Sequence, residues 1–385
     1  MKKLLSLLLS VLLLCSLCAC GGTAEPVETE PFVWYHTGPV EVSQRTLEDA
    51  AEADYVQPKN VILMIADGMG VNDIENARNF AEDKFSYGLA MDFLPARGTC
   101  TTHSDSSDVT DSAAAATALA TGVKTTNSFV GMDPDGQPVK NVCEVAREQG
   151  KKIGVVTNDD MTGATPSGFL VHHNSRDDTV ALWDQMVAAG PDVLIGNGEY
   201  AMREIGLSES SLAALDNYLV APYFSKFTTV LDKDPEKPFY GYLASNVYES
   251  DNFLAYSTEI ALNRLENEKG FFLMVEGCGT DKSGHKNNLE GKLSSVVTFD
   301  RAVAVAMDYC LKHPDTVLII TADHECGGVS LPADRATKDT ITFSTTDHTG
   351  QDVVLLALGY GTQQFHGQVS DNTDIAKFMM ELLQQ

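Results

Sequence analysis

Positive charge is scarce in this chain of 385 residues, and its scarcity excludes one class of partner. Lysine and arginine together number 27, against 54 aspartates and glutamates, which gives a formal net charge of −27 at pH 7. A surface this acidic repels the phosphate backbone of DNA and RNA, so we expect no nucleic acid binding. An anionic small substrate would have to be attracted by local cations, either metal ions or a well-placed arginine.

The N-terminal segment contains an apolar run that is too short to span a membrane comfortably. Two lysines precede apolar residues 4–17, which is the pattern of a secretory signal. The ending "LCAC" resembles a bacterial lipobox, and lipid on Cys20 would anchor the mature protein to the membrane. We expect residues 1–20 to be a lipoprotein signal peptide, and the protein to be exported to the bacterial cell surface or the periplasmic face. The alternative is an ordinary secretory signal that is rich in cysteine.

Cysteines beyond this segment are few, odd in number and scattered. They are Cys100, Cys143, Cys278, Cys310 and Cys326. Such a set gives no disulfide framework in an exported chain, so we expect no essential network of bridges. Two of them, Cys278 and Cys326, lie close in sequence to the motifs described below. Each is either a metal ligand or a small buried thiol.

The rest of the chain divides into an acidic segment and one large domain. Residues 21–56 hold eight acidic residues, a single base and several prolines, which suits a tether between a membrane and a folded domain. From residue 57 to residue 385, short apolar runs alternate with helical patterns. We therefore expect a linker over 21–56 and a folded domain over 57–385.

The alternating pattern predicts the fold class. Strands are predicted at 60–66, 152–157, 193–196, 271–275, 317–321 and 353–358, and helices at 143–149, 178–189, 253–268, 294–311 and 373–383. This alternation is typical of an α/β fold, a three-layer sandwich with a central, mostly parallel sheet and helices on both faces.

Polar side chains follow four of these strands where each strand ends. Asp67 follows "VILMIA", polar residues 158–165 follow "IGVVT", Glu276 follows "FFLMV", and Asp323 and His324 follow "VLIITA". Ligands of such sheets bind beyond the carboxyl ends of the strands. The four clusters therefore predict one shared site.

Three of the nine histidines fall in short motifs that also carry carboxylates. "VEGCGTDKSGH" holds Asp281 and His285, "TADHE" holds His324, and "TTDHTG" holds His348. Carboxylates and imidazoles suit zinc. Each residue alone is more often a hydrogen-bonded structural group, but together with Asp67 they would be too costly to bury without cations.

A stretch of small residues, "VTDSAAAATALATGVKTTN", predicts a helix packed tightly in the core. Its first turn holds Asp111 and Ser112, and the unpaired amides and dipole of a helix N-terminus favour an anion there. Asp111 either caps this helix or orients Arg176.

Taken in order, "NVILMIADGMG", the small-residue stretch, "ATPSGFLVHHNSR", "VEGCGTDKSGH", "TADHE" and "DHTG" resemble the alkaline phosphatase family. The resemblance runs from about Lys59 to near the C-terminus. It implies that residues 57–385 are an alkaline phosphatase-like catalytic domain that hydrolyses phosphate monoesters of small molecules, with two zinc ions and one magnesium ion as cofactors.

The resemblance also implies a role for each site residue. One zinc is bound by Asp281, His285 and His348, the second by Asp67, Asp323 and His324, and magnesium by Asp67, Thr165 and Glu276. Ser112 matches the nucleophile, which forms a phosphoserine and is itself counted among the metal ligands. Arg176 matches the phosphate clamp. Asp111 and Lys282 are expected to help bind substrate, although Lys282 also fits a solvated lysine.

Two departures from the family pattern leave questions open. Gly163 occupies a place where some members have an acidic residue or a histidine near the third metal, and Asp159 and Asp160 are out of register. Only 23 residues separate His324 from His348, where larger relatives insert a lobe that helps form a dimer interface. The oligomeric state is therefore open, with a homodimer as the family's usual form.

The alternatives to the enzyme are a phosphodiesterase of the same superfamily and a noncatalytic surface lipoprotein that binds phosphate or metals. A sulfatase fits poorly because "TDSAAAA" lacks the C/S-x-P-x-R setting.

Overall fold

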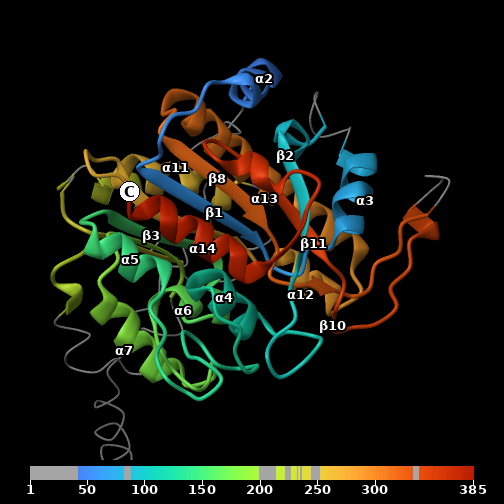
Figure 1. The fold of residues 1–385 in the computed structure, drawn as a ribbon, viewed down its shortest axis with the longest axis horizontal. Helices are drawn as coiled ribbons and strands as arrows, with labels where there is room; N and C mark the ends of the chain where they lie inside the picture. Colours follow the sequence, from blue (N-terminus) through green and yellow to red (C-terminus); the bar gives the residue numbers. More distant parts are fainter. Residues whose placement is uncertain are drawn as a thin grey trace, which may run out of the picture. The chain divides into compact units, whose positions relative to one another are not determined.

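A ten-stranded sheet forms the centre of the fold (Figure 1). The computed structural model describes residues 42–81, 88–198, 214–221, 227–231, 233–234, 236–243, 252–332 and 338–385, which all belong to one unit, residues 38–385. The predicted signal peptide 1–20, with Cys20, lies outside the described residues. Within those ranges, no helix is both long and apolar enough to cross a membrane.

The strands run across the sheet in the order β12, β2, β11, β8, β1, β7, β3, β4, β6 and β5. Their bounds are Asn60–Ala66 (β1), Ala96–Thr101 (β2), Lys152–Asp160 (β3), Val193–Asn197 (β4), Leu219–Ala221 (β5), Phe239–Leu243 (β6), Phe271–Gly277 (β7), Thr316–Thr321 (β8), Val353–Leu358 (β11) and Val369–Asp371 (β12). Of these ten, β11 alone runs against the others. A separate two-stranded sheet pairs β9 (Glu325–Cys326) with β10 (His348–Thr349).

All six predicted strands are present, and the mostly parallel sheet is confirmed. Six strands were missed, namely β2, β5, β6 and β12 of the central sheet and the two-residue strands β9 and β10. The sequence of β2, "ARGTCT", has no apolar run, and its burial is only partial. Strands β5 and β12 have three residues each and lie at the two edges. Strands this short or this polar carry little of the hydrophobic pattern that reveals a strand.

Helices cover both faces of the sheet (Figure 1). One layer contains α4 (Ser112–Thr121), α5 (Val142–Glu148), α6 (Ala164–Leu170), α7 (Thr179–Ala189) and α14 (Asn372–Leu383), and the other contains α2 (Gln44–Glu52), α3 (Val71–Ala81), α11 (Phe253–Leu265), α12 (Gly279–Gly284) and α13 (Leu289–Lys312). The short α10 (Phe227–Leu231) lies beside β5. Helix α13 begins five residues earlier than predicted, because the Asn288 side chain caps it by accepting a hydrogen bond from the Gly291 N–H.

Helix α2 corrects part of the predicted linker. Residues 44–52 fall inside the range 21–56 that was expected to be a tether, but they form a helix capped by Ser43. Leu47 and Ala50 are fully buried in the main core, on the side of α13. Burial of the apolar face that carries Leu47 and Ala50 stabilises the helix, as is usual for a helix with one apolar face. The tether prediction is therefore wrong for this stretch, while residues 21–41 lie outside the described residues.

The small-residue helix α4 is a core helix, as predicted. All ten of its residues are buried. Small side chains let it approach α6 at close range, since a Cβ on Gly168 of α6 would lie 2.7 Å from the Cβ of Ala116. This contact fixes the first turn of α4, which carries Ser112, relative to the first turn of α6, which carries Thr165.

The five cysteines of the described chain are all free and buried. None of them forms a bridge with another described residue, in agreement with the sequence prediction.

Candidate active site

The carboxyl ends of the central parallel strands bring seven of the twelve predicted site residues to one pocket of about 220 Å³. Asp67 directly follows β1, Glu276 is the second-to-last residue of β7, and Asp323 and His324 follow β8. Among the predicted site residues, those that line the pocket are Asp67, Ser112, Thr165, Arg176, Glu276, Asp281 and Lys282.

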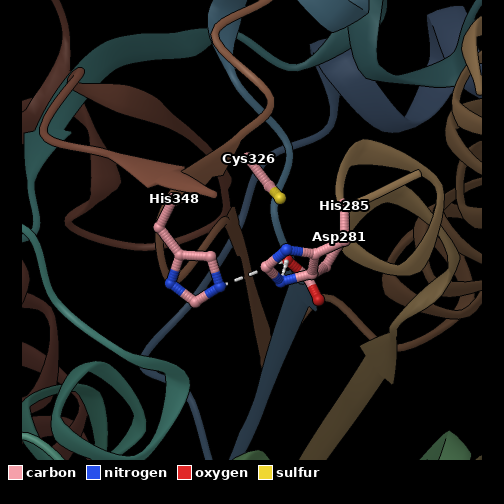
Figure 2. A group of neighbouring side chains, drawn as sticks. All are labelled: Asp281, His285, Cys326 and His348. Carbon is pink, nitrogen blue, oxygen red and sulfur yellow. Dashed lines mark ion pairs between the residues drawn. The ribbon is translucent and has the colours of Figure 1, made fainter. Parts of the chain in front are cut away.

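The first cluster of potential metal ligands joins α12 to the small sheet (Figure 2). Nε2 of His285 lies 3.3 Å from Oδ1 of Asp281, and Nε2 of His348 lies 3.4 Å from the same oxygen. Two ligands that are each about 2.0–2.2 Å from a tetrahedral zinc ion lie about 3.3–3.6 Å apart. Both distances fit pairs of ligands on one such ion, and the ligand atoms of all three residues lie within 4.8 Å of one another. Cys326 belongs to the same cluster.

Backbone carbonyls fix the orientation of both imidazoles. Nδ1 of His285 lies 2.6 Å from the Thr346 carbonyl oxygen, and Nδ1 of His348 lies 3.0 Å from the Thr110 carbonyl oxygen. In each ring Nδ1–H donates to the carbonyl, which leaves the Nε2 lone pair for a metal.

The second cluster is centred on His324, which is fully buried. Its Nε2 lies 3.2 Å from Oδ2 of Asp323, 3.6 Å from Oδ1 of Asp67 and 3.2 Å from Oγ of Ser112. One nitrogen thus faces two carboxylates and a hydroxyl. Asp67 and His324 also form, with Asp281, a second group whose ligand atoms all lie within 4.8 Å of one another. The structure brings the four predicted residues of this site together from β1, α4 and β8.

Three carboxylate oxygens in the two clusters are buried without a hydrogen-bond donor among the described residues. Within the described chain, Asp67 Oδ1, Asp281 Oδ1 and Asp323 Oδ2 accept no hydrogen bond. Burial, and next the charge of Asp323, raise the pKa of Asp67 well above its usual range, while burial and then Asp281 raise the pKa of Asp323 to about 6. Burial also lowers the pKa of His324, which favours the neutral imidazole that binds metals. Such a donor set fits divalent cations.

A third group lies next to Asp67. Thr165 Oγ1 is buried and has no hydrogen-bond partner among the described residues. Glu276 accepts a hydrogen bond of 2.5 Å from Thr157, and burial, followed by the charge of Asp159, raises its pKa to about 8. A carboxylate, a hydroxyl and Asp67 form an oxygen-rich set of the type that magnesium prefers. The glycine at position 163 fits the local turn, because a Cβ there would lie 2.8 Å from the Asp160 carbonyl oxygen.

Asp111 both caps α4 and holds Arg176, one task for each carboxylate oxygen. Oδ1 accepts a hydrogen bond of 2.9 Å from the Ala114 N–H. Oδ2 accepts one of 3.0 Å from the Ser128 N–H and one of 3.2 Å from Nη1 of Arg176. The two interpretations that the sequence left open are therefore compatible, and Arg176 is held in the pocket that Ser112 also lines.

Lys282 is paired rather than freely solvated. Its Nζ lies 2.9 Å from Oδ2 of Asp159, at the end of β3, and both residues line the pocket. Burial opposes the charged form, but the charge and hydrogen bond of Asp159 outweigh it and raise the pKa of Lys282. The sequence did not assign Asp159 to the site. Its only signal was the acidic pair at the end of a predicted strand.

The fold and the site define a metal-binding hydrolase, and comparison with known proteins identifies its family. The family model described as alkaline phosphatase matches residues 58–203 and 245–336. Alkaline phosphatase 4 of Bacillus subtilis is 33% identical over 76% of this chain and 67% of that protein. Streptomycin-6-phosphate phosphatase of Streptomyces griseus is 31% identical over 82% of this chain and 83% of that protein.

Solved structures agree with this assignment. The alkaline phosphatase of the Antarctic bacterium TAB5 is 28% identical, with a TM-score of 0.76 over 86% of this chain and 98% of that one. A cold-active alkaline phosphatase from Shewanella sp. is 27% identical, with a TM-score of 0.76 over 85% of this chain and all of that one. The chain belongs to the alkaline phosphatase family and is a phosphatase that acts on phosphate monoesters.

Proposed function

We propose that the protein hydrolyses phosphate monoesters through a covalent phosphoserine on Ser112, at a site for two zinc ions and one magnesium ion. The observation that carries the proposal is the position of the Ser112 Oγ, 3.2 Å from the His324 Nε2 at the first residue of α4. A hydroxyl at a buried helix N-terminus, next to two clusters of potential metal ligands, is suited to attack a bound phosphoryl group.

The ligand sets proposed for the metals follow the clusters described above. The first zinc would be held by Asp281, His285 and His348. The second would be held by Asp67, Asp323, His324 and, through its hydroxyl, Ser112. When bound, the metals supply Lewis-acid stabilisation, which lowers the pKa of a hydroxyl or water and neutralises charge on the reacting oxygens.

The proposed magnesium would be held by Asp67, Thr165 and Glu276. Support comes from the TAB5 enzyme, in which variants with a histidine replaced by aspartate or glutamate carry magnesium in the M3 site. The orphaned Thr165 hydroxyl and the buried Glu276 carboxyl offer the oxygen ligands that such an ion needs.

Ser112 and a water molecule carry the two chemical steps. The Ser112 Oγ forms a bond to phosphorus as the ester P–O bond breaks, and the alcohol leaves with a proton. The oxygen of a water molecule then forms a bond to phosphorus as the bond to Oγ breaks, which releases inorganic phosphate and restores the hydroxyl. Backbone N–H groups of the first turn of α4 face the phosphoryl oxygens and favour their negative charge.

Arg176 orients the phosphoryl group. One of its nitrogens is held by Asp111 at 3.2 Å, so the planar fork is fixed before substrate arrives. The guanidinium lines the pocket, where its remaining donors suit two nonbridging oxygens. This local cation, the paired Lys282 and the metals would attract a dianionic ester into a protein whose formal net charge is −27.

The identified residues contact the phosphoryl group and none of them is assigned to the alcohol part of the ester. We therefore propose that the enzyme accepts esters of many different alcohols. The family includes members whose names indicate a particular substrate, as with the streptomycin-6-phosphate phosphatase. A noncatalytic binding protein would not need the Ser112 hydroxyl beside His324. The arginine clamp argues against a phosphodiesterase, because a diester carries one negative charge where a monoester dianion carries two, and so gains less from the Arg176 cation.

The test compares p-nitrophenyl phosphate with its bis-ester, using the purified protein with and without a chelator. We expect hydrolysis of the monoester, little hydrolysis of the diester, and loss of both with the chelator. Ser112→Ala should abolish turnover while the protein still folds and binds zinc. Ser295→Ala is a matched control, because among the described residues its hydroxyl bonds only within α13, to the Gly291 carbonyl oxygen at 2.8 Å.

Two results would contradict the proposal. Activity that survives metal removal would exclude the metal site from the reaction, and normal turnover by Ser112→Ala would exclude the phosphoserine. Rapid acid quench with a monoester labelled in the phosphoryl group should trap label on the native protein and none on Ser112→Ala.

A further inference from the structure

Cys326 lies inside the first cluster of potential metal ligands, and the family resemblance gave it no role. Its Sγ lies within 4.8 Å of ligand atoms of Asp281, His285 and His348. Figure 2 shows the sulfur pointing toward the Asp281 and His285 side chains. Oδ1 of Asp281, a residue only 7% exposed, has no hydrogen-bond partner in the described part of the chain.

The backbone builds this arrangement through strand register. Cys326 and His348 are directly opposite each other in the antiparallel pair of β9 and β10. Directly opposed residues project their side chains from the same face of the pair. The register therefore places the thiol and the imidazole next to one another, with β9 following directly after His324.

A glycine makes room for the sulfur. A Cβ on Gly284 of α12 would lie 2.9 Å from the Cys326 Sγ and 3.0 Å from its Cβ, which is too close for any larger residue. The same helix supplies Asp281 and ends at His285. The helix that carries two of the ligands is thus packed directly onto the cysteine.

Cys278 provides the contrast within the same protein. It is also fully buried and also precedes ligands in the chain, at the N-cap of α12. Its backbone N–H donates to Asn158 Oδ1 at 2.8 Å. Among the described residues, its sulfur joins neither group that could hold a metal ion.

We infer that Cys326 supplies a sulfur ligand to the metal held by Asp281, His285 and His348, which makes this an Asp-His-His-Cys site. The inference deepens the proposed function, since it rests on the first zinc site. Metal binding would release the thiol proton to solvent, and the thiolate would bond to the metal. A zinc ion held by these four residues would still accept an oxygen of the substrate as a fifth ligand, as some catalytic zinc sites do.

The first experiment detects the sulfur ligand from the absorption spectrum of the bound metal and does not depend on enzyme turnover. The purified protein is stripped of metal, loaded with Co²⁺, and its absorption spectrum recorded. We expect an ultraviolet sulfur-to-cobalt charge-transfer band in the unmodified protein and in Cys278→Ser. The band should be absent in Cys326→Ser, and its presence there, or its absence from the unmodified protein, would overturn the inference.

The second experiment separates a ligand from a hydrogen-bond donor. A thiol that only donated to Asp281 could be replaced by a serine hydroxyl, so Cys326→Ser would keep its zinc affinity and Cys326→Ala would lose it. A sulfur ligand predicts that both variants lose affinity, by more than the roughly 10- to 100-fold expected for an outer-shell partner. Zinc affinity is measured by competition with a chromophoric chelator, with Cys278→Ser as the control.

Failure of this inference and failure of the proposed function are distinguishable. If Cys326→Ser binds zinc normally while Ser112→Ala remains inactive, the phosphoserine mechanism stands without the sulfur ligand. If the cobalt band is present but no labelled Ser112 is trapped, the ligand set stands and the mechanism is wrong.

Discussion

Lys292 and Asp73 form an ion pair with no solvent exposure, and breaking it should destabilise both the fold and the metal site. Nζ of Lys292 lies 2.7 Å from Oδ2 of Asp73 and donates a hydrogen bond of 2.9 Å to the Gly68 carbonyl oxygen. The same Asp73 oxygen accepts from the Gly70 N–H at 2.8 Å. The pair therefore holds both sides of the turn that follows Asp67.

The turn formed by residues 68–70 is packed closely against other segments on two sides, so it has little room to move without a clash. A Cβ on Gly68, whose φ is +75°, would lie 2.6 Å from the Asp281 backbone. A Cβ on Gly70 would lie 2.4 Å from the Glu325 side chain. A small shift of the turn would move Asp67 relative to Asp281, and so would separate ligands proposed for neighbouring metals.

The change with the clearest expected magnitude is Lys292→Met, which keeps the length of the side chain and removes its charge. The Asp73 carboxyl is left buried and unpaired, and removal of one partner of a buried pair costs about 3–5 kcal/mol. Burial already raises the pKa of Asp73 to about 6 against the opposing effect of Lys292, so loss of the lysine should raise it further. A loss of this size is a large part of an ordinary folding free energy of about 5–15 kcal/mol.

The control lies on the same helix. Lys312 pairs with Asp308 at 2.5 Å, but its side chain is 64% exposed, and an exposed pair contributes about 0–1 kcal/mol. Urea unfolding of metal-free protein should show a much larger loss for Lys292→Met than for Lys312→Met. Zinc affinity should fall about 10- to 100-fold for Lys292→Met alone, as for an outer-shell partner. Equal unfolding curves for the two variants would refute the reasoning.

Four further predictions concern other parts of the molecule. Arg176→Lys should lower kcat/KM for monoesters about 10- to 100-fold, because an ammonium cannot reproduce the paired bonds of the guanidinium; a steady-state loss below twofold would exclude substrate contact. In metal-free protein, burial raises the pKa of Glu276 from 4.5 to about 8, so the folded state keeps a proton that the unfolded chain has lost, and stability should fall as pH rises across that window. Urea titrations at pH 5 and 8 test this, and no fall would contradict it. Gly168→Ala should cost about 1–3 kcal/mol by overpacking against Ala116, and an unchanged melting temperature would show that the helices separate freely. We also propose export with lipid on Cys20, so Cys20→Ala should move the protein from the membrane fraction to the soluble one; persistence in the membrane fraction would contradict the anchor.

The central strands and their polar ends could be predicted because both signals are local. A buried strand such as β1 is a continuous apolar run, and Asp67 follows it directly. The parallel arrangement then requires that the ends of such strands meet at one edge. The outer strands β12 and β2 could not be predicted in this way, since β12 has only three residues and β2 has no continuous apolar run, and both are placed by their pairing with neighbouring strands.

The sequence by itself determined the order of the motifs, and with it the family, the fold class and the residues expected at the site. Only the tertiary structure decided between chemically equal candidates. Cys278 and Cys326 are both buried thiols beside ligand motifs, and strand register together with Gly284 brings the second into the cluster. The ion pair of Lys282 with Asp159 likewise joins two residues that are far apart in the sequence and that only the fold brings together. Residue type and local pattern indicate which bonds a side chain can form. Which residue it bonds with depends on the distant segments that pack against it, and that packing is set by the whole fold.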